Sequence, residues 1–354
     1  MGDVCNTSTG NKNTQDKIED GVYPFYVRSQ TVERINSWTF DGEAILTAGD
    51  GVGVGKVFHH TYGKIGVHQR VYILSDFKCD ANYLFHFFSS KFYNRVKRMS
   101  AKNSVDSVRK EMITDMPLSL PCRKEQVKIG RLLTLLDERI TTQNKIIEDL
   151  KKLKSAIIEK HYRQVEKQTV CIADLGEHFS VGNLAKDDLS ETGTPCILYG
   201  ELFTTYGETI SQIESRTNKT GGMVLSKKGD LLFPSSTTVD ALSLIAPSVI
   251  NIDNVVLGGD MFGIHINSNF DAQYLSYFFN HIAKRRLAKY AKGSTIIHLH
   301  YADIEKAKLL LPCLKEQHRM AKCLVSLDNK INVVTLSLNL LNNQKTYLLR
   351  HMFI

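Results

Sequence analysis

The chain contains 354 residues, 42% of them apolar and 23% charged, which is an ordinary globular composition with room for two or more domains. Its formal net charge of +8 permits binding to a polyanion. Its seven cysteines, an odd number without a C-x-x-C pair, argue against a disulfide framework or a zinc site and favour buried free thiols. No apolar run approaches the length of a membrane span and no signal-peptide pattern opens the chain, so we expect a cytoplasmic protein without a membrane segment.

Residues 1–120 are predicted to form a first globular unit of mixed α and β structure. Runs of β-branched and aromatic residues at 43–47 and 69–74 indicate short strands, with Gly and polar residues marking the turns. Asp80 is a candidate N-cap, and the aromatic residues after it recur at helical spacing, which predicts an amphipathic helix.

Residues 121–166 are predicted to form a long spacer helix that opens after Pro121, where proline costs a helix least. A helix of this length spans roughly 60 Å at about 1.5 Å per residue, too long for one compact domain. Its apolar residues recur at steps that alternate between four and three, the repeat of a coiled-coil seam. The seam positions are Ile129, Leu133, Leu136, Ile140, Gln143, Ile147, Leu150, Lys154, Ile157 and His161.

Residues 167–311 are predicted to form a second globular unit that repeats the first at a constant offset, here called the repeat register, which aligns Asp80 with Asp271. The segment 271–279 matches 80–88 in six of nine positions, and strands are predicted at 229–233 and 261–266. Met1-Gly2-Asp3 aligns loosely with Leu175-Gly176-Glu177. The opening strand predicted at 169–174 has no equivalent in the first unit, so either that unit lacks an edge strand or its start lies upstream.

Residues 312–354 are predicted to form a second spacer helix in the same repeat register. Leu120-Pro121-Cys122-Arg123-Lys124-Glu125-Gln126 returns as Leu311-Pro312-Cys313-Leu314-Lys315-Glu316-Gln317, and Lys345 repeats the polar seam position of Lys154. The second seam consists of Met320, Leu324, Leu327, Ile331, Val334, Leu338, Leu341, Lys345, Leu348 and Met352. The chain is therefore a tandem duplication of a globular unit followed by a long helix.

No motif in the sequence predicts catalysis. The Gly-rich loop ending at Lys56 fits neither a phosphate-binding loop nor a dinucleotide fingerprint, and a strand-connecting turn is favoured. No two prolines are adjacent, which excludes the Asn/Asp-Pro-Pro-aromatic loop of a nucleic-acid methyltransferase. His298 and His300 alternate as strand residues do and have no carboxylate or Cys at metal-ligand spacing.

Basic residues cluster after the aromatic helix in both units, and Arg95 maps onto Arg286. A single run of this kind is usually a solvated face, but two at equivalent places favour contact with phosphates. Polar turns follow each cluster where groove-reading side chains could project. The candidate DNA-binding residues are Lys56, Lys64, Arg70, Lys97, Arg98, Lys102, Asn103, Lys227, Lys228, Lys284, Arg285, Arg286, Lys292, Ser294 and Thr295.

Two divergent globular units, each followed by a helix that opens Leu-Pro-x-x-x-Glu-Gln, resemble the specificity subunit of type I restriction–modification enzymes. The resemblance covers essentially the whole chain. It is carried by the two Pro-Cys motifs with Leu136-Asp137 and Leu327-Asp328, and by the turn Gly293-Ser294-Thr295. The chain departs from the family in lacking the first opening strand and in having Ala101-Lys102-Asn103 where the family tends to have Gly-Ser.

The resemblance implies an α+β protein in which two target-recognition domains each read half of a bipartite site in double-stranded DNA. It implies that the two helices pack as an antiparallel coiled coil with pseudo-twofold symmetry, set the half-site spacing and dock two modification subunits. It also implies a non-catalytic chain that binds no cofactor or metal, with S-adenosylmethionine, ATP and Mg held by the modification and restriction subunits.

The expected subunit-interface residues of the helices are Leu132, Leu133, Leu136, Ile140, Ile147, Leu150, Leu324, Leu327, Ile331, Leu338 and Leu341. Apolar residues off the seam, such as Leu132, Ile146, Leu153 and Ile158, are expected to face partner helices. Two alternatives remain open at this point, namely a coiled-coil interaction scaffold without DNA specificity and a stand-alone enzyme with an unrecognised site.

Overall fold

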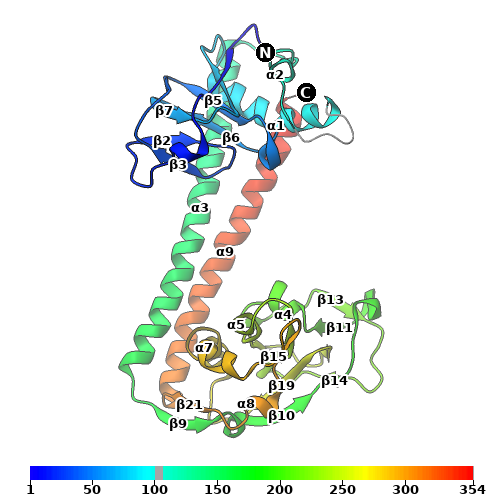
Figure 1. Ribbon diagram of the computed structural model, residues 1–354. Coiled ribbons are helices and arrows are strands. Elements are labelled where there is room, and N and C mark those ends of the chain that lie inside the picture. The colour runs from blue at the N-terminus through cyan, green and yellow to red at the C-terminus, as the bar shows by residue number, and fades with distance from the viewer. Residues whose placement is uncertain (100–106, 354) are drawn as a thin grey trace. The chain divides into compact units, whose positions relative to one another are not determined.

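The computed structural model describes residues 1–99 and 107–353 and divides into two compact units (Figure 1). The first unit comprises Met1–Lys145 and Thr335–Ile354, and the second comprises Ile146–Val334. Each unit therefore contains one globular part and about half of each long helix. The predicted boundaries follow the sequence repeat, whereas the two compact units follow contacts in space. The division into residues 1–120, 121–166, 167–311 and 312–354 therefore stays a prediction.

The globular part of the first unit contains two four-stranded sheets. One is antiparallel, in the order β1 (Asn6–Thr9), β8 (Val71–Ser75), β5 (Ala44–Ala48) and β6 (Phe58–Thr61). The other has the order β3 (Val32–Ile35), β2 (Tyr23–Tyr26), β7 (Lys64–Val67) and β4 (Phe40–Asp41), with β2 and β7 parallel. The predicted strands at 43–47 and 69–74 correspond to β5 and β8. Short 3-10 turns lie at Thr14–Asp16 and Gly51–Gly53.

An aromatic helix, α1 (Ala81–Met99), supplies the core of the first unit, and α2 (Lys110–Thr114) follows it. Asp80 accepts a hydrogen bond from the amide of Tyr83 at 2.9 Å, so it acts as the predicted N-cap. Phe353, just after the second long helix, packs edge-on against the rings of Tyr83 and Phe87, with centroids 5.3 and 5.6 Å apart. The end of the chain is thus part of this core.

The globular part of the second unit contains a five-stranded sheet, a four-stranded sheet and two strand pairs. The five-stranded sheet has the order β10 (Gly176–Ser180), β19 (Met261–Ile266), β15 (Asp230–Pro234), β17 (Ser248–Ile250) and β12 (Thr209–Ile210). The four-stranded sheet has the order β13 (Ser215–Thr217), β11 (Leu189–Leu198), β18 (Val256–Gly258) and β14 (Val224–Leu225). The pairs are β16 (Ser236–Thr237) with β20 (Ile297–His298), and β21 (Lys308–Leu311) with β9 (Gln168–Cys171).

The helices of this second globular part are short. They are α4 (Glu201–Thr204), α5 (Ala241–Leu244), α6 (Ala272–Phe278), α7 (Lys284–Leu287) and α8 (Tyr301–Ile304). A π-helical turn at Phe279–Ala283 separates α6 from α7, where the equivalent α1 is continuous. The opening strand predicted at 169–174 ends at Cys171, because Ile172–Leu175 form a 3-10 turn. Further 3-10 turns lie at Lys186–Asp188 and Ala288–Tyr290.

Strand order confirms the duplication. The sheet β3-β2-β7-β4 has the order and directions of β13-β11-β18-β14, and β1-β8-β5-β6 matches the first four strands of the five-stranded sheet. The strand pairing also corrects the alignment of the first residues. Asn6 pairs with Ser75, five residues beyond the backbone hydrogen bond from Gly49 to Arg70, and Glu177 pairs with His265, five residues beyond that from Ser235 to Asp260, so Asn6 corresponds to Glu177. The alignment of Met1 with Leu175 was wrong, because Leu175 lies two residues before Glu177 whereas Met1 lies five residues before Asn6.

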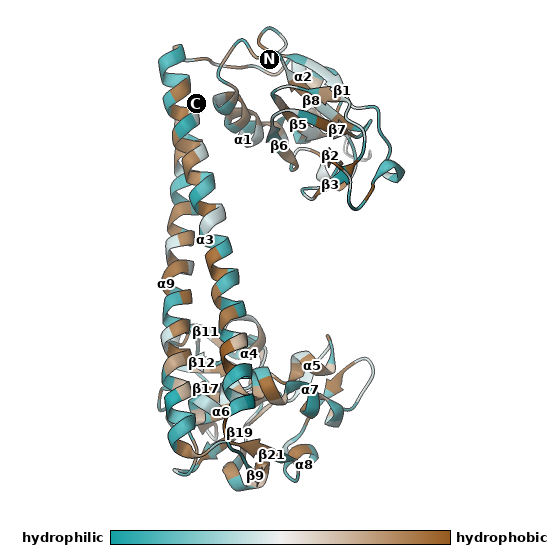
Figure 2. Ribbon diagram, turned by 90° about the vertical axis from the view of Figure 1, so that its left-hand side faces the viewer, coloured by the Kyte–Doolittle hydropathy of each residue, from teal (hydrophilic) through white to brown (hydrophobic). Residues whose placement is uncertain are grey.

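The two long helices are α3 (Arg123–Gln164) and α9 (Leu314–Met352). Apolar residues recur along both of them (Figure 2). In the second unit the pairing is antiparallel, because Lys154 contacts Asp328 whereas His161, further along α3, contacts Glu316, which is earlier in α9. Ile158 is fully buried in the core of this unit, so the expectation that it faces a partner was wrong.

The glutamine of the repeated motif explains why the motif recurs. The Gln126 side-chain amide donates to the carbonyl of Pro121 at 2.8 Å and accepts from the amide of Asp80 at 2.9 Å. Gln317 makes the same two bonds, to Pro312 at 2.8 Å and from Asp271 at 3.0 Å. Both glutamines are buried, so each satisfies backbone groups at a helix start and fixes the long helix to the N-cap of the aromatic helix.

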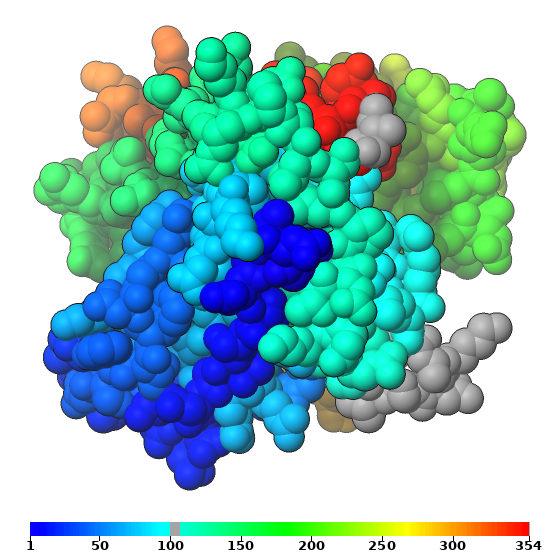
Figure 3. Space-filling view, turned by 90° about the horizontal axis from the view of Figure 1, so that it is seen from above, coloured from blue at the N-terminus to red at the C-terminus, as the bar shows by residue number. Residues whose placement is uncertain are grey.

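The first unit begins at the point where β9 ends in the second. The amino group of Met1 donates to the carbonyls of Thr114 and Met116 at 3.0 and 2.8 Å, and the first residues lie against this segment (Figure 3). In the second unit the amide of Ile172 donates at 3.1 Å to Ala307, which is equivalent to Met116 in the repeat register. Met1 therefore stands where Ile172 stands, and among residues 1–99 and 107–353 no strand in the first unit corresponds to β9.

Candidate nucleic-acid interface

The basic cluster of the second unit lies on α7 and beside a cavity of about 730 Å³. Lys284 borders this cavity together with Ser236, Asp260 and His298. Arg285 is exposed and borders a second hollow of about 520 Å³. Burial raises the pKa of the Tyr162 phenol on α3, and the nearby charge of Arg286, an exposed residue, opposes that rise.

The polar turn after this cluster is held by its own contacts. Lys292 exchanges backbone hydrogen bonds with His298, and its ammonium forms an ion pair with Asp303 at 2.5 Å. Ser294 and Thr295 are exposed at the tip of the turn. The ammonium of Lys292 therefore has a carboxylate partner and still faces solvent, with 76% of its side chain exposed, and Ser294 and Thr295 are exposed as well.

The described candidate residues of the first unit lie on several segments of the chain. Lys56 lies over the ring of Tyr93 and Lys64 over that of Trp38, at 5.4 and 5.1 Å from the ring centroids. Lys97 and Arg98 are exposed in the last turn of α1. Lys102 and Asn103 lie outside the described residues.

Arg95 has a structural role. It donates from Nε to the carbonyl of Met112 at 2.7 Å and from an η nitrogen to that of Asp115 at 3.0 Å. Two of its guanidinium donors therefore bind the end of α2. The equivalence of Arg95 with Arg286 therefore does not support a shared phosphate site.

Lys227 and Lys228 are exposed in the turn before β15. Their amides donate to Asp230 and Asp253, both at 2.8 Å. These bonds fix the turn and leave both ammonium groups in solvent.

Arg70 belongs to a cluster that the sequence did not reveal. Asp50 accepts a hydrogen bond from Arg28 at 2.8 Å and lies 3.7 Å from Arg70. The amide of Arg70 donates to Nδ1 of the buried His68 at 3.0 Å. Arg28 and Arg70 retain 45% and 65% of their side-chain exposure, so the guanidinium of Arg28 is oriented by Asp50 and both guanidiniums face solvent.

The helix residues expected at subunit interfaces are mostly covered within each unit, and Leu133 and Leu324 belong to the two globular cores. Leu133, Leu136, Leu324 and Ile331 are buried, and the half-buried members are Ile140, Ile147, Leu150, Leu327, Leu338 and Leu341. Leu132 is 42% exposed. Other large apolar residues exposed on the helices of the first unit are Val127, Leu135, Leu336, Leu340 and Tyr347.

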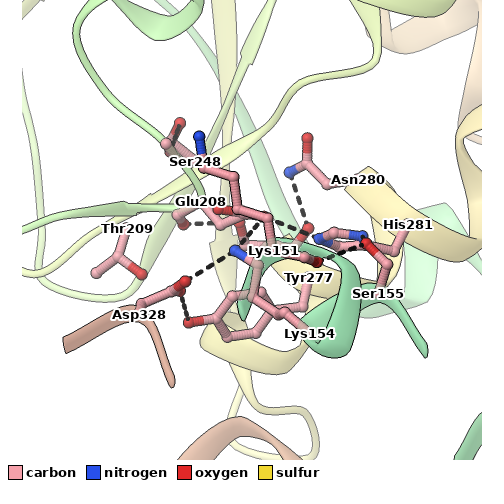
Figure 4. A network of polar contacts seen from close by, with 12 residues as sticks. Lys151, Lys154, Ser155, Glu208, Thr209, Ser248, Tyr277, Asn280, His281 and Asp328 are labelled. Atoms are coloured by element: carbon pink, nitrogen blue, oxygen red, sulfur yellow. Dashed lines mark hydrogen bonds and ion pairs between the residues drawn. The ribbon is translucent and has the colours of Figure 1, made fainter. Parts of the chain in front are cut away.

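The seam lysine of α3 is the centre of a buried polar network (Figure 4). Lys154 Nζ donates to Glu208 at 2.9 Å and to Asp328 at 2.8 Å, and Asp328 also accepts from the hydroxyl of Tyr277 at 2.5 Å. Burial opposes ionisation of Glu208, but its bonds with His281 and Lys154 outweigh burial and lower its pKa to about 2. The network joins α3, α9 and the globular part of the second unit.

The first unit contains the reciprocal ion pair, between Lys345 and Asp137. In the repeat register Lys345 is equivalent to Lys154, and Asp328 is equivalent to Asp137. The second unit therefore takes its lysine from α3 and its aspartate from α9, whereas the first unit takes its lysine from α9 and its aspartate from α3. His86 replaces Tyr277 and lies 3.8 Å from Asp137. Burial lowers the pKa of His86 to about 4, against the opposing charge of Asp137.

The whole chain was compared with known families and structures. A model of the type I restriction modification DNA specificity domain matches residues 1–152 and 164–343. The chain belongs to this family. Family membership confirms the identification made from the sequence, and it assigns the chain to the subunits that recognise DNA rather than those that catalyse the reaction.

Individual type I specificity subunits are similar over different shares of the chain. The EcoDI subunit of Escherichia coli is 29% identical over 45% of this chain but only 36% of that relative. The MjaVIII subunit of Methanocaldococcus jannaschii is 25% identical over 89% of this chain and 78% of the relative. A specificity subunit assigned to Haemophilus influenzae is 23% identical over 92% of this chain and 86% of the relative.

Solved specificity-subunit structures share the fold. The type I S subunit from M. genitalium has a TM-score of 0.72 at 15% identity and covers 99% of this chain and 94% of its own. A chain from a study of type I assembly and conformational transition has a TM-score of 0.53 at 13% identity. These similarities confirm the predicted fold class of two mixed α/β units with long helices.

Two further findings concern the described part of this specificity subunit. No helix there is long and apolar enough to cross a membrane. No group of three or more His, Cys, Asp or Glu residues there could hold a metal ion. All seven cysteines are free thiols, although Cys122, Cys313 and Cys323 are exposed rather than buried.

Proposed function

We propose that this specificity subunit reads a bipartite site in double-stranded DNA, one half with each recognition domain, and acts in the cytoplasm. The observation that carries the proposal is the duplicated strand order, because two equivalent frames have diverged in their loops. Divergent loops on a shared frame suit two related sites with different ligands. The candidate residues on α7 and at the tips of the turns would contact phosphates and position the frame.

We propose that the long helices set the spacing between half-sites. In support, α3 and α9 span 42 and 39 residues without a break, and ion pairs at equivalent positions hold their register in each unit. A helix of this length rises roughly 60 Å, which exceeds one turn of DNA, about 34 Å.

The partners we propose are double-stranded DNA, two modification subunits and the restriction subunit. The exposed apolar residues of α3 and α9, Leu132 among them, would meet helices of the modification subunits, because such residues are unfavourable in water unless covered. S-adenosylmethionine, ATP and Mg would be bound by these partners and not by this chain.

Salt-dependent binding to duplex DNA tests the role of the basic cluster. We expect Lys284→Ala and Arg285→Ala to weaken binding of the complex with modification subunits to all sequences alike. Each should lower the slope of log affinity against log salt by about one, because each removes one phosphate contact. The measurement is retardation of a labelled duplex between low and physiological salt.

The matched control is Lys306→Ala, because Lys306 is an exposed lysine of the same unit and its contact with Glu305, 3.9 Å away, is weak. This change should leave the slope unaltered. An unchanged slope in both cluster variants would remove α7 from the interface, and no binding of the wild-type complex to any duplex would contradict the proposed function.

A further inference from the structure

The two recognition domains can be superimposed residue by residue through their backbone hydrogen bonds. The amide of Gly49 donates to Arg70 at 2.7 Å, and the amide of Ser235 donates to Asp260 at 2.7 Å. The amide of Val108 donates to Gly49 at 2.8 Å, and its equivalent in the repeat register, that of Leu299, donates to Ser235 at 2.9 Å. Arg70 therefore corresponds to Asp260, and the residues after the two bonded amides, Asp50 and Ser236, correspond to each other.

A third pair of positions follows from the parallel strands. Val67 lies three residues before Arg70, and Leu257 lies three residues before Asp260; Tyr26 pairs with Val67, and Ile197 pairs with Leu257. Tyr26 thus corresponds to Ile197, and two positions further on Arg28 corresponds to Tyr199.

These three positions converge in both domains, but they carry different chemistry. In the first domain Asp50 accepts a hydrogen bond from Arg28 at 2.8 Å and lies 3.7 Å from Arg70. In the second, Tyr199, Ser236 and Asp260 all border the cavity of about 730 Å³. Ser236 donates to the exposed carboxylate of Asp260 at 2.8 Å. The position that two guanidinium groups occupy in the first domain is therefore a cavity in the second. The carboxylate of Asp260, a hydrogen-bond acceptor that Ser236 orients, borders this cavity.

The carboxylate in each cluster argues against simple phosphate contacts, since an acid repels phosphate. A guanidinium fixed by an acid presents a directed pair of donors, which matches O6 and N7 of guanine in the major groove. A carboxylate fixed by a serine accepts instead, and the base edge it suits is the amino group of cytosine.

Resting on the proposed function, we propose that these three positions form the base-reading site of each recognition domain. Arg28, Asp50 and Arg70 select guanine in one half-site. Tyr199, Ser236 and Asp260 select cytosine in the other.

The test uses the full chain assembled with its modification subunits and a duplex library randomised in both half-sites. Arg70→Ala should lower discrimination for guanine at one position of one half-site on the order of ten- to a hundredfold. Arg70→Lys should lose the same discrimination, because an ammonium keeps the charge but not the planar pair of donors. Since Arg70 is 65% exposed, neither change disturbs the core.

Asp260→Asn tests the second domain, and Lys78→Ala is the control. The asparagine amide pairs with adenine, so preference should move from cytosine to adenine in the other half-site alone. Lys78 is an exposed lysine beyond the opposite end of β8 from Arg70, so its loss should alter neither half-site.

Three results would overturn the inference. Arg70→Lys could discriminate as the wild type does, Arg70→Ala could weaken binding to all sequences equally, or both half-sites could stay unchanged in Arg70→Ala and Asp260→Asn. Each would leave the proposed function standing. A wild-type complex that selects no sequence would overturn the proposed function and this inference together.

Discussion

Single residues account for the differences between the two halves of the duplication. Tyr277 and His86 occupy one position of the repeat, next to Asp328 and Asp137. The tyrosine hydroxyl reaches its carboxylate at 2.5 Å, whereas the histidine lies 3.8 Å from its own, too far for a hydrogen bond. His86 instead contacts the hydroxyl of Thr134 at 3.1 Å through Nε2. Because it is buried, it stays neutral in the fold at pH values where a free histidine is protonated.

His86 therefore makes stability depend on pH. Its folded pKa of about 4 lies below the unfolded value of 6.5, so its contribution is complete above pH 6.5 and is lost as pH falls toward 4. The loss should have a slope of about 1.4 kcal/mol per pH unit. His86→Tyr, which copies the second unit, should abolish this slope between pH 4 and 6.5. Thermal melting of the full chain at a series of pH values measures it, and an unchanged slope would contradict the assignment.

At the scale of elements, the long helices differ in how firmly their seam lysines are held. Lys154 is buried between two carboxylates, whereas Lys345 retains 29% side-chain exposure and faces only Asp137 among the described acids. A buried pair broken on one side leaves an uncompensated charge, while an exposed pair contributes little.

Lys154→Ala should therefore destabilise the protein by about 3–5 kcal/mol, and Lys345→Ala by about 1 kcal/mol or less. Denaturant unfolding of both variants measures the difference. The depressed pKa of Glu208 adds a second signature in the wild type, because its stabilising effect is present above about pH 4.5 and is lost as pH falls toward 2. Equal losses of unfolding free energy in the two variants would show that the Lys154 network stabilises the protein no more than the pair of Lys345 with Asp137.

The helices and strands could be predicted from sequence because their signals are local or recur in one register. The 3.5-residue seam and the equivalence of Lys154 with Lys345 needed only the repeat register. Glu208, which accepts a hydrogen bond from Lys154, could not be predicted. The loops before β15 differ between the repeats, so the repeat register does not align Glu208 with any residue of the first unit. Asp50 and Asp260 were missed for the same reason, since they belong to corresponding clusters but lie at different positions within them.

At the scale of the whole molecule, the reciprocal ion pairs allow a matched test of the helices as spacers. One heptad inserted after Lys145 in α3 shifts that helix against α9, so the register of Lys154 with Asp328 and of Lys345 with Asp137 cannot both persist. We expect this single insertion to abolish assembly or alter spacing. Heptads inserted after Lys145 and at the equivalent point of α9, after Leu336, should restore both pairs.

The double insertion should lengthen the preferred gap between half-sites by roughly three base pairs, because seven residues rise about 10 Å and one base pair about 3.4 Å. Mapping of modified bases by the assembled complex measures the gap. A double-insertion variant that keeps the wild-type gap would contradict the spacer role.

The composition of the units has a consequence for biosynthesis. The second unit is one continuous segment, Ile146–Val334, whereas the first needs Thr335–Ile354 and includes the ring of Phe353 in its core. Domains generally fold as they leave the ribosome, in order of synthesis. Here the order is inverted, since residues 1–145 stay incomplete, with apolar surface uncovered, until residues 335–353 emerge. Loss of residues 335–353 would therefore damage the unit that is built mainly from residues 1–145.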